Sequence, residues 1–198
     1  CLKNTAVSPP PVTGIWQTVW MEPVDAAGLK SVYIIPDLDR GRFVVEPEFY
    51  GFADGQAVEV LIKDGSKVVS RNRQKASPAL SMEMPVKNVK TWSPESPFLY
   101  DVVLNVYDKD GRLLDTVNSY AGMRKIHVEG NRYYLNNKPY YLRLVLDQGF
   151  YPDGIWTAPS DEALRRDIEL SMAAGFNGAR LHQKVFEERF HYWADKLG

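Results

Sequence analysis

The sequence has little cysteine, almost no net charge and no long apolar run, and each shortage excludes a class of protein. A single Cys among 198 residues excludes a disulfide scaffold and a cysteine-based metal knuckle. The 24 Lys and Arg residues nearly balance the 25 Asp and Glu residues, whereas nucleic-acid binders need a basic face to displace phosphate counterions. No apolar run approaches the roughly 18–20 residues that cross a bilayer. We therefore expect no nucleic-acid partner and no membrane span.

The first residues predict an extended lead-in and then a strand. The chain lacks an initiator Met and the charged, then apolar, start of a signal peptide, so Cys1 is interpreted as a processed or cloned end. A lipid-modified N-terminal Cys is the alternative. Pro9, Pro10 and Pro11 favour a stiff, extended segment. The following run, TGIWQTVWMEPV, alternates in a way that predicts a strand over 15–20.

Residues 27–125 carry the pattern of an all-β domain. Short strand-like runs such as SVYIIP, RFVVEPEFYG and AVEVLI recur between turn signals. Asp64-Gly65 and Asp110-Gly111 each separate two such runs, and Asp-Gly supplies the positive φ of a type I′ hairpin turn. The run that begins at Tyr100 alternates to give one strongly apolar face. This spacing predicts an immunoglobulin-like or fibronectin-like β-sandwich.

Residues 126–198 have a different pattern, in which strands alternate with helices. A buried-looking strand, YYLRLVL, precedes a helix for which Ser160 is a good N-cap and Gly175 fits the C-terminal left-handed position. A strand, FNGARL, and a second helix follow. The helices are predicted from apolar residues at helical spacing: Leu164, Ile168 and Met172 in the first, and Phe186, Phe190, Trp193 and Leu197 in the second. This pattern is typical of a parallel sheet.

Candidate site residues follow the two predicted parallel strands, at the end where barrel enzymes place their sites. The first strand leads into Asp147 and Gln148 and then into an aromatic loop that includes Trp156; the second ends in Arg180 and His182. Carboxylates and amides bind sugar hydroxyls, and aromatic faces stack on the C–H face of a pyranose. The structural alternatives are a helix-capping Asp147, a salt-bridged Arg180 and rings that simply cover a sheet edge.

Other chemical patterns are missing from the sequence. It has no Gly-rich phosphate loop and no serine in a nucleophile-elbow sequence. Its three His residues do not stand at metal-ligand spacing with carboxylates. The pair Glu187-Glu188 opens a helix, where acidic residues are expected because of the helix dipole. We therefore expect no cofactor and no metal.

Four segments in collinear order resemble glycoside hydrolase family 2, the β-galactosidase, β-glucuronidase and β-mannosidase group. TGIWQTVWMEPV resembles the end of its jelly-roll sugar-binding domain, and WSPESPFLYDVVLNVYDKDG resembles its central sandwich. GMRKIHVEGNRYYLNNKPYYLRLVLDQ resembles the junction into its barrel, and DEALRRDIELSMAAGFNGARLHQ with FHYWADKLG resembles the first two barrel units. The resemblance implies a mainly β chain with a C-terminal α/β part. We expect a jelly-roll remnant over 1–26, an immunoglobulin-like sandwich over 27–125 and a truncated (β/α)8 barrel over 126–198.

The resemblance implies that the parent protein, of which this chain is a segment, is a retaining exo-glycosidase. Such enzymes use one Glu as acid/base and another as nucleophile, roughly 5–5.5 Å apart. The family acid/base stands in an Asn-Glu pair on a later strand, and this chain has no such pair, so the segment alone is expected to be inactive. Arg180 matches the family Arg that orients the nucleophile carboxylate.

Asp147 and Gln148 stand where many family members have Arg-His, and His182 lies one residue nearer to Arg180 than the family His. These departures favour a divergent subgroup whose sugar differs from galactose. Two other interpretations stay open: a free-standing carbohydrate-binding or adhesion module, and a regulatory α/β protein. Two parallel strands without neighbours would leave an open edge, which predicts self-association or a mobile C-terminal third. The compartment is not fixed by the sequence, although a periplasmic, secreted or surface-anchored parent fits such hydrolases.

Overall fold

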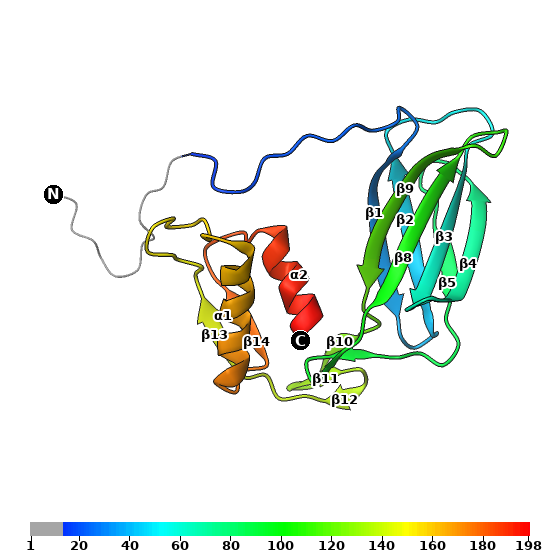
Figure 1. Cartoon of the computed structure of the whole chain (residues 1–198). Helices are drawn as coiled ribbons and strands as arrows, with labels where there is room; N and C mark the ends of the chain where they lie inside the picture. The colour runs from blue at the N-terminus through cyan, green and yellow to red at the C-terminus, as the bar shows by residue number, and fades with distance from the viewer. Residues whose placement is uncertain (1–13) are drawn as a thin grey trace. The chain divides into compact units, whose positions relative to one another are not determined.

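The computed structural model describes residues 14–198, and its internal contacts divide them into two units (Figure 1). Glu22–Tyr141 form one unit, and residues 14–21 with Leu142–Leu197 form the other. The Cys1 end and the lead-in of Pro9 to Pro11 lie outside the described residues. The division falls after Tyr141, whereas the sequence placed a domain boundary after residue 125.

Glu22–Tyr141 contain a sandwich of two antiparallel sheets, with strand orders β1-β2-β5 and β4-β3-β8-β9. This confirms the two-sheet sandwich that the sequence predicted. The strands are β1 Leu29–Asp37, β2 Arg42–Phe49, β3 Ala57–Asp64, β4 Lys67–Lys75, β5 Met82–Pro85, β8 Tyr100–Tyr107 and β9 Leu113–Ala121. Two short strands, β6 Trp92–Ser93 and β7 Ser96–Pro97, pair with each other and lie between β5 and β8 in the sequence.

The sandwich core comes from the inward-facing residues of both sheets. Side chains alternate between the two faces of a strand, so every second residue of β8 is buried, as predicted from its alternation. Tyr100 begins this buried row, and its hydroxyl accepts a 2.7 Å hydrogen bond from the Lys90 backbone N–H. A Tyr at the start of this strand that binds the backbone upstream is typical of immunoglobulin-like sandwiches. The fully inaccessible apolar core residues are Phe43, Val45, Val58, Val60, Ile62, Met82, Met84, Val102, Leu104, Val106 and Met123.

Two buried polar side chains in the sandwich are satisfied by specific partners. The Gln56 side chain accepts from the Ala53 N–H at 2.8 Å and donates to the Ala27 carbonyl at 2.8 Å. Glu59 accepts two hydrogen bonds from the Arg71 guanidinium, from Nε at 2.8 Å and from Nη2 at 2.6 Å. Because buried polar groups are costly unless they are bonded, these contacts fix the loop before β3 and the β3–β4 pair.

The two Asp-Gly hairpins form, but the first uses a different turn from the one predicted. Asp64 pairs with Lys67, so the two loop residues are Gly65 and Ser66. Gly65 has a φ of +59° and Ser66 has no positive φ, which is the type II′ pattern, with Gly first, and not type I′. In the second hairpin, Gly111 has a φ of +79° in a longer loop.

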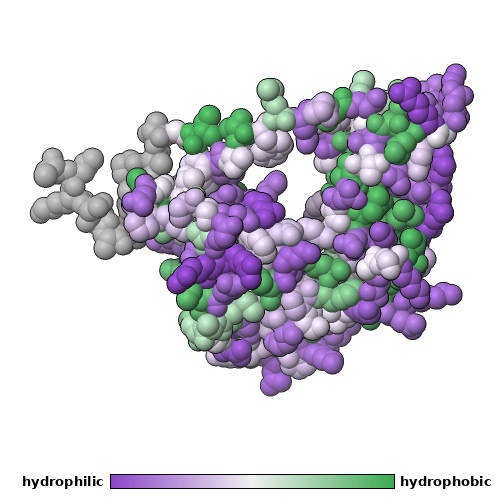
Figure 2. All heavy atoms as spheres, viewed as in Figure 1, coloured by the Kyte–Doolittle hydropathy of each residue, from purple (hydrophilic) through white to green (hydrophobic). Residues whose placement is uncertain are grey.

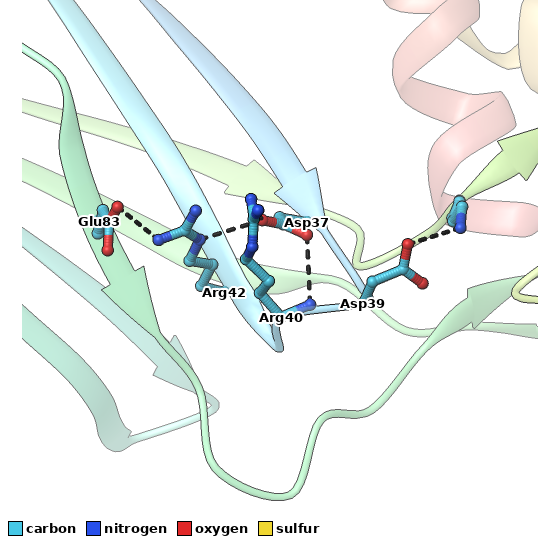
Figure 3. Close-up of polar contacts among 6 residues, drawn as sticks. Asp37, Asp39, Arg40, Arg42 and Glu83 are labelled. Carbon is cyan, nitrogen blue, oxygen red and sulfur yellow. Dashed lines mark hydrogen bonds and ion pairs between the residues drawn. The ribbon is translucent and has the colours of Figure 1, made fainter.

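Ion pairs at the turn between β1 and β2 connect three strands and a small neighbouring sheet. Figure 3 shows Arg42 between Asp37 and Glu83, with Nε 3.1 Å from Asp37 Oδ2. Asp39 accepts a 2.6 Å hydrogen bond from Lys125 Nζ. The small sheet is formed by β10 Ile126–Glu129, β11 Arg132–Leu135 and β12 Lys138–Pro139. Asn136, between β11 and β12, donates to the Trp92 carbonyl, so this sheet groups with the sandwich.

Leu142–Leu197 have the strand–helix–strand–helix order that the sequence predicted. The elements are β13 Leu144–Asp147, α1 Asp161–Ala173, β14 Gly178–Leu181 and α2 Glu188–Leu197. The two strands pair in parallel, and β13 is shorter than the predicted strand YYLRLVL. Ser160 caps α1 by accepting from the Ala163 N–H. At the other end Gly175 has a φ of +90°, and the Phe176 N–H bonds to the Ser171 carbonyl, which is a Schellman motif.

The predicted strand over 15–20 does not form, since residues 14–25 have no strand in the structure. A strand needs a partner for its backbone groups, and none of the described strands pairs with this segment. Several of its apolar side chains are exposed, including Ile15, Val19 and Met21. Hydrophobic surface is visible along the segment that leads to β1 in Figure 2. On α1, Leu164 and Ile168 are buried, whereas Met172 at the same helical spacing is 37% exposed.

Candidate functional site

The candidate site lies where β13 and β14 end. Asp147 pairs with Leu181 in the parallel register, and the His182 N–H continues the ladder by donating to the Asp147 carbonyl at 2.9 Å. The residues that follow both strands are therefore neighbours, although they are more than thirty positions apart in the sequence. In parallel α/β sheets this edge is where ligand sites form.

Three predicted residues come together at this edge. The Gln148 side-chain nitrogen lies 3.1 Å from His182 Nδ1 and donates to Gln183 Oε1 at 3.3 Å. A neutral imidazole with its proton on Nε2 accepts such a bond at Nδ1. Asp147 Oδ1 accepts a 2.7 Å hydrogen bond from the Gly149 N–H. Asp147 thus fixes the start of the following loop and does not cap a helix.

Arg180 stands on β14 in register with Leu146 and is exposed. Within residues 14–198, no hydrogen bond or ion pair engages its guanidinium, so the alternative of a salt-bridged Arg180 is wrong for this part of the chain. A fixed planar guanidinium binds carboxylates in bidentate geometry. Among residues 14–198, the N–H donors of the Arg180 guanidinium thus have no protein partner.

Trp156 lies at the far end of the loop that follows β13, in a cluster of aromatic rings. Its ring meets Trp16 edge to face, with centroids 5.5 Å apart and an interplanar angle of 88°, and Phe150 lies at 6.3 Å. The Trp156 indole nitrogen is buried and has no hydrogen-bond partner among the described residues. An unpaired buried donor of this kind is uncommon in a folded protein.

The loop between β13 and α1 is tightly folded on itself. Tyr151 and Ile155 exchange two backbone hydrogen bonds of 2.8 and 3.0 Å, and Ile155 adopts a φ of +55°. Gln183, after β14, also has a positive φ, of +58°. Left-handed backbone is costly for a β-branched residue, and such strain tends to gather at functional sites.

Tyr151 has a structural role within this loop. Its hydroxyl donates a 2.7 Å hydrogen bond to Asp167 Oδ2 on α1. Burial, and then this bond to a carboxylate, raise the pKa of Tyr151 far above its usual value. The Tyr151 hydroxyl therefore joins this loop to α1.

Sequence reasoning missed Lys184, which joins the two loops. Its ammonium donates to the Gly149 carbonyl at 2.8 Å and to the Trp156 carbonyl at 2.9 Å. Burial lowers the pKa of the Lys184 ammonium below its usual value, while nearby carboxylates act in the opposite direction. The sequence does not predict these contacts, because the partners of Lys184 are backbone carbonyls of another loop and belong to no residue pattern.

A separate groove of about 650 Å³ lies on the sandwich unit. It is lined by β1, β2 and the segment before β5, and it includes Tyr33, Glu46, Glu48 and Phe52. Tyr33 is 69% exposed and Phe52 is 52% exposed. Glu48 is engaged by Lys30 and by the Ser31 hydroxyl. The groove thus combines exposed rings with carboxylates.

Among residues 14–198, no three His, Cys, Asp or Glu side chains are grouped so that they could hold a metal ion. Over the same residues, no helix has the length and hydropathy needed to traverse a bilayer.

Comparisons with known proteins connect these features to a family. Residues 29–124 match the profile of glycosyl hydrolases family 2. The chain is 26% identical to a β-galactosidase of Enterobacter cloacae and 25% identical to one of Lactococcus lactis subsp. lactis, with 94% of the chain matched in both. The chain therefore resembles the glycosyl hydrolases of family 2. It spans only 20% and 18% of the length of those two relatives.

Solved structures show the same fold as this chain. A β-glucuronidase from Ruminococcus gnavus in complex with D-glucuronic acid superposes with a TM-score of 0.73 at 21% identity, covering 86% of this chain and 28% of that one. A β-D-glucuronidase of Dictyoglomus thermophilum superposes with a TM-score of 0.73 at 24% identity, with the same coverage. These superpositions cover 86% of the chain, whereas the family profile covers residues 29–124 only, so the similarity in fold extends beyond the residues that the profile matches.

Proposed function

We propose that this chain forms part of a retaining exo-glycoside hydrolase of family 2 that cleaves O-glycosidic bonds of oligo- or polysaccharides. The observation that carries the proposal is the group of Asp147, Gln148 and His182 beside an unengaged Arg180 at the carboxyl ends of two parallel strands. Amides and carboxylates in this position suit the hydroxyls of a sugar. The β-galactosidase relatives support the same reaction class.

We infer the following correspondence between the chain and such an enzyme. Residues 142–197 are the first two units of a (β/α)8 barrel, and the parallel pairing of β13 with β14 supports this. The sandwich corresponds to the central domain of such an enzyme. In sequence order, residues 1–26 correspond to the end of its sugar-binding jelly roll, and residues 1–13 of this range lie outside the described structure.

In this proposal Arg180 is the side chain that orients the catalytic nucleophile. A retaining enzyme needs two carboxyl groups roughly 5–5.5 Å apart, one to attack the sugar and one to protonate the leaving oxygen. Neither is assigned to this chain, which has no Asn-Glu pair. Arg180 then lies beside a nucleophile contributed from elsewhere in the parent protein. Asp147, Gln148, His182 and Trp156 bind and orient the sugar.

A panel of chromogenic glycosides tests the proposal. The parent protein should release the chromophore from at least one glycoside, and the 198-residue chain alone should release none. Replacing Arg180 with Ala in the parent should lower kcat by about 10²- to 10³-fold, because an electrostatic contact to the reacting groups is lost. Arg132→Ala, at an exposed position of β11, is the matched control and should leave kcat unchanged. A parent that cleaves no glycoside of the panel would overturn the proposal.

The groove on the sandwich favours a second candidate function, a carbohydrate-binding module. Exposed Tyr33 and Phe52 provide ring faces for stacking, and Glu46 provides a carboxylate for hydroxyls. Isothermal titration of the chain with oligosaccharides separates the candidates. Saturable binding that Tyr33→Ala abolishes supports the module. No saturable binding, with hydrolysis by the parent, supports the enzyme alone.

We also propose that the open β13–β14 pair makes this chain self-associate. This sheet has two strands among the described residues, and Leu144 and Leu146 are 43% and 55% exposed. An unpaired strand edge with apolar side chains is a template for another chain. Light scattering after size-exclusion chromatography should show a concentration-dependent dimer, which Leu146→Lys should abolish. A monodisperse monomer with a well-protected C-terminal third would contradict the proposal.

A further inference from the structure

Lys184 holds together the two ends of the loop that follows β13. Its two acceptors are the carbonyls of Gly149, at the start of this loop, and of Trp156, near its end. Gly149 has a φ of +61°, and a Cβ at this position would lie 2.6 Å from Lys184 Nζ. The absence of a side chain at residue 149 therefore allows the ammonium to approach the backbone.

The same ammonium faces aromatic rings from three segments. Its Nζ lies 4.7 Å from the ring centroid of Phe186, 5.3 Å from that of Trp16 and 5.9 Å from that of Tyr151. A cation within about 6 Å of a ring centroid is attracted by the ring. No ion pair within residues 14–198 includes Lys184, so carbonyl oxygens and ring faces replace a carboxylate as its partners.

The Trp16 ring belongs to a segment that precedes the whole sandwich in the sequence, and this segment is bound to both loops. The Trp16 carbonyl accepts a 2.9 Å hydrogen bond from the Thr157 hydroxyl. The Gln17 side chain donates to the Val185 carbonyl at 3.1 Å. Trp16 is also in edge-to-face contact with Trp156. Residues 16–17 are thus a component of the loop cluster at the ends of β13 and β14.

We propose that Lys184 is a positioning residue that fixes Trp16 and Trp156 as one aromatic wall of the sugar site. This inference rests on the proposed glycosidase function. The Lys184 ammonium sets the distance between the loop ends by its two carbonyl bonds and holds Trp16 against the loop by its charge. Without it, the loop carbonyls lose a charged donor and the two indole rings lose their common support. The consequence is a wall that no longer stacks on a pyranose with one defined geometry.

The first experiment measures the loop itself in the 198-residue chain. Lys184→Met keeps the apolar stem and removes the donor. It should speed hydrogen exchange at the Tyr151 and Ile155 amides by about tenfold or more, since the two loop carbonyls lose a charged hydrogen-bond donor. The indole N–H resonances of Trp16 and Trp156 should shift together. Lys67→Met, at an exposed hairpin position, is the matched control and should change neither.

The second experiment measures hydrolysis by the parent protein with its preferred chromogenic glycoside. Lys184→Met should raise KM about tenfold and change kcat less than threefold, because stacking acts on the bound sugar before and during reaction. Lys184→Arg keeps the charge and should recover part of the KM. Trp16→Phe leaves both carbonyl bonds intact, so it should raise KM with little change in loop exchange. It provides an independent test if Lys184→Met fails to fold.

The outcomes separate this inference from the proposed function. An inactive wild-type parent overturns the proposed function, while hydrogen exchange still decides whether Lys184 holds the loop. An active parent with unchanged loop exchange in Lys184→Met overturns the positioning role. A looser loop with unchanged KM in both Lys184→Met and Trp16→Phe overturns the aromatic wall. A looser loop with a raised KM and nearly unchanged kcat supports the inference in full.

Discussion

Phe190→Ala should unfold the α/β unit while leaving the sandwich intact. Phe190 lies on α2, is 5% exposed and packs against Phe186 with ring centroids 4.7 Å apart. With Leu164 and Ile168 these two rings are the four buried members of this core. Removing a buried Phe side chain costs about 3–5 kcal/mol, partly as lost burial and partly as the cavity left behind. Only partly buried neighbours such as Leu181, Trp193 and Leu197 surround these four residues, so the loss falls on a small core.

Native-state hydrogen exchange of the 198-residue chain measures this loss unit by unit. About 1.4 kcal/mol corresponds to tenfold, so 3–5 kcal/mol predicts exchange roughly 10²- to 10³-fold faster, or somewhat more, in α1 and α2. Complete loss of protection in both helices would also agree with the prediction. It is expected if the free energy of unfolding of this unit is smaller than the stability that Phe190→Ala removes. Amides of β3 and β8 should keep their wild-type rates.

The matched control is Leu104→Ala in the other core, where Leu104 is fully inaccessible. It should cost about 2–5 kcal/mol and speed exchange in β3 and β8, with α1 and α2 unchanged. The reasoning would be refuted if either variant accelerated exchange in both units by the same factor, since the chain would then unfold as one cooperative body. A change of less than tenfold in α1 for Phe190→Ala would refute the importance of this core.

Three further predictions follow from single contacts. Gly149→Ala should destabilise the α/β unit by about 1–2 kcal/mol in urea titration, because φ at this position is positive and a Cβ would lie 2.9 Å from the Phe186 ring; an unchanged midpoint would contradict this. Tyr100→Phe should lower sandwich stability by about 1–3 kcal/mol, since the Lys90 N–H loses its acceptor; thermal melts measure it. The hydrogen bond from Lys125 lowers the pKa of Asp39 in the folded chain. The ionised Asp39 therefore stabilises the sandwich at any pH above the ordinary carboxyl pKa of about 4, and this contribution is lost as the pH falls through the lowered pKa of the folded state. Asp39→Asn should therefore reduce the loss of sandwich stability between about pH 5 and about pH 2. An acid unfolding transition that is the same in Asp39→Asn and in the wild type would count against this.

The sandwich and the order of its C-terminal elements were accessible to sequence reasoning because they depend on local patterns. Alternation in β8 reports which residues are buried, and it identifies Tyr100, Val102, Leu104 and Val106 correctly. The Ser160 cap of α1 and its Gly175 end are likewise decided within a few residues. The alternation of strands with helices in the C-terminal part likewise predicted the parallel pairing of β13 with β14.

Features that depend on distant partners were not accessible in the same way. The alternation over 15–20 resembles a strand, but strand formation needs a neighbouring backbone that the described chain does not offer there. Turn type at Gly65 depends on register, which a bulge between Ile62 and Lys63 shifts by one residue. The Lys184 contacts join backbone atoms of another loop, so no spacing in the sequence announces them.

The docking of residues 16–17 also orders events during synthesis. Trp16 and Thr157 are 141 positions apart, and a ribosome that adds about 5–20 residues per second needs on the order of ten seconds to make the residues between them. During this interval the sandwich emerges complete, while Trp16 and Gln17 still lack the loop partners that they contact in the folded chain. Translation past the second parallel strand therefore supplies the last of these partners, whereas Ile15, Val19 and Met21 stay exposed even after docking.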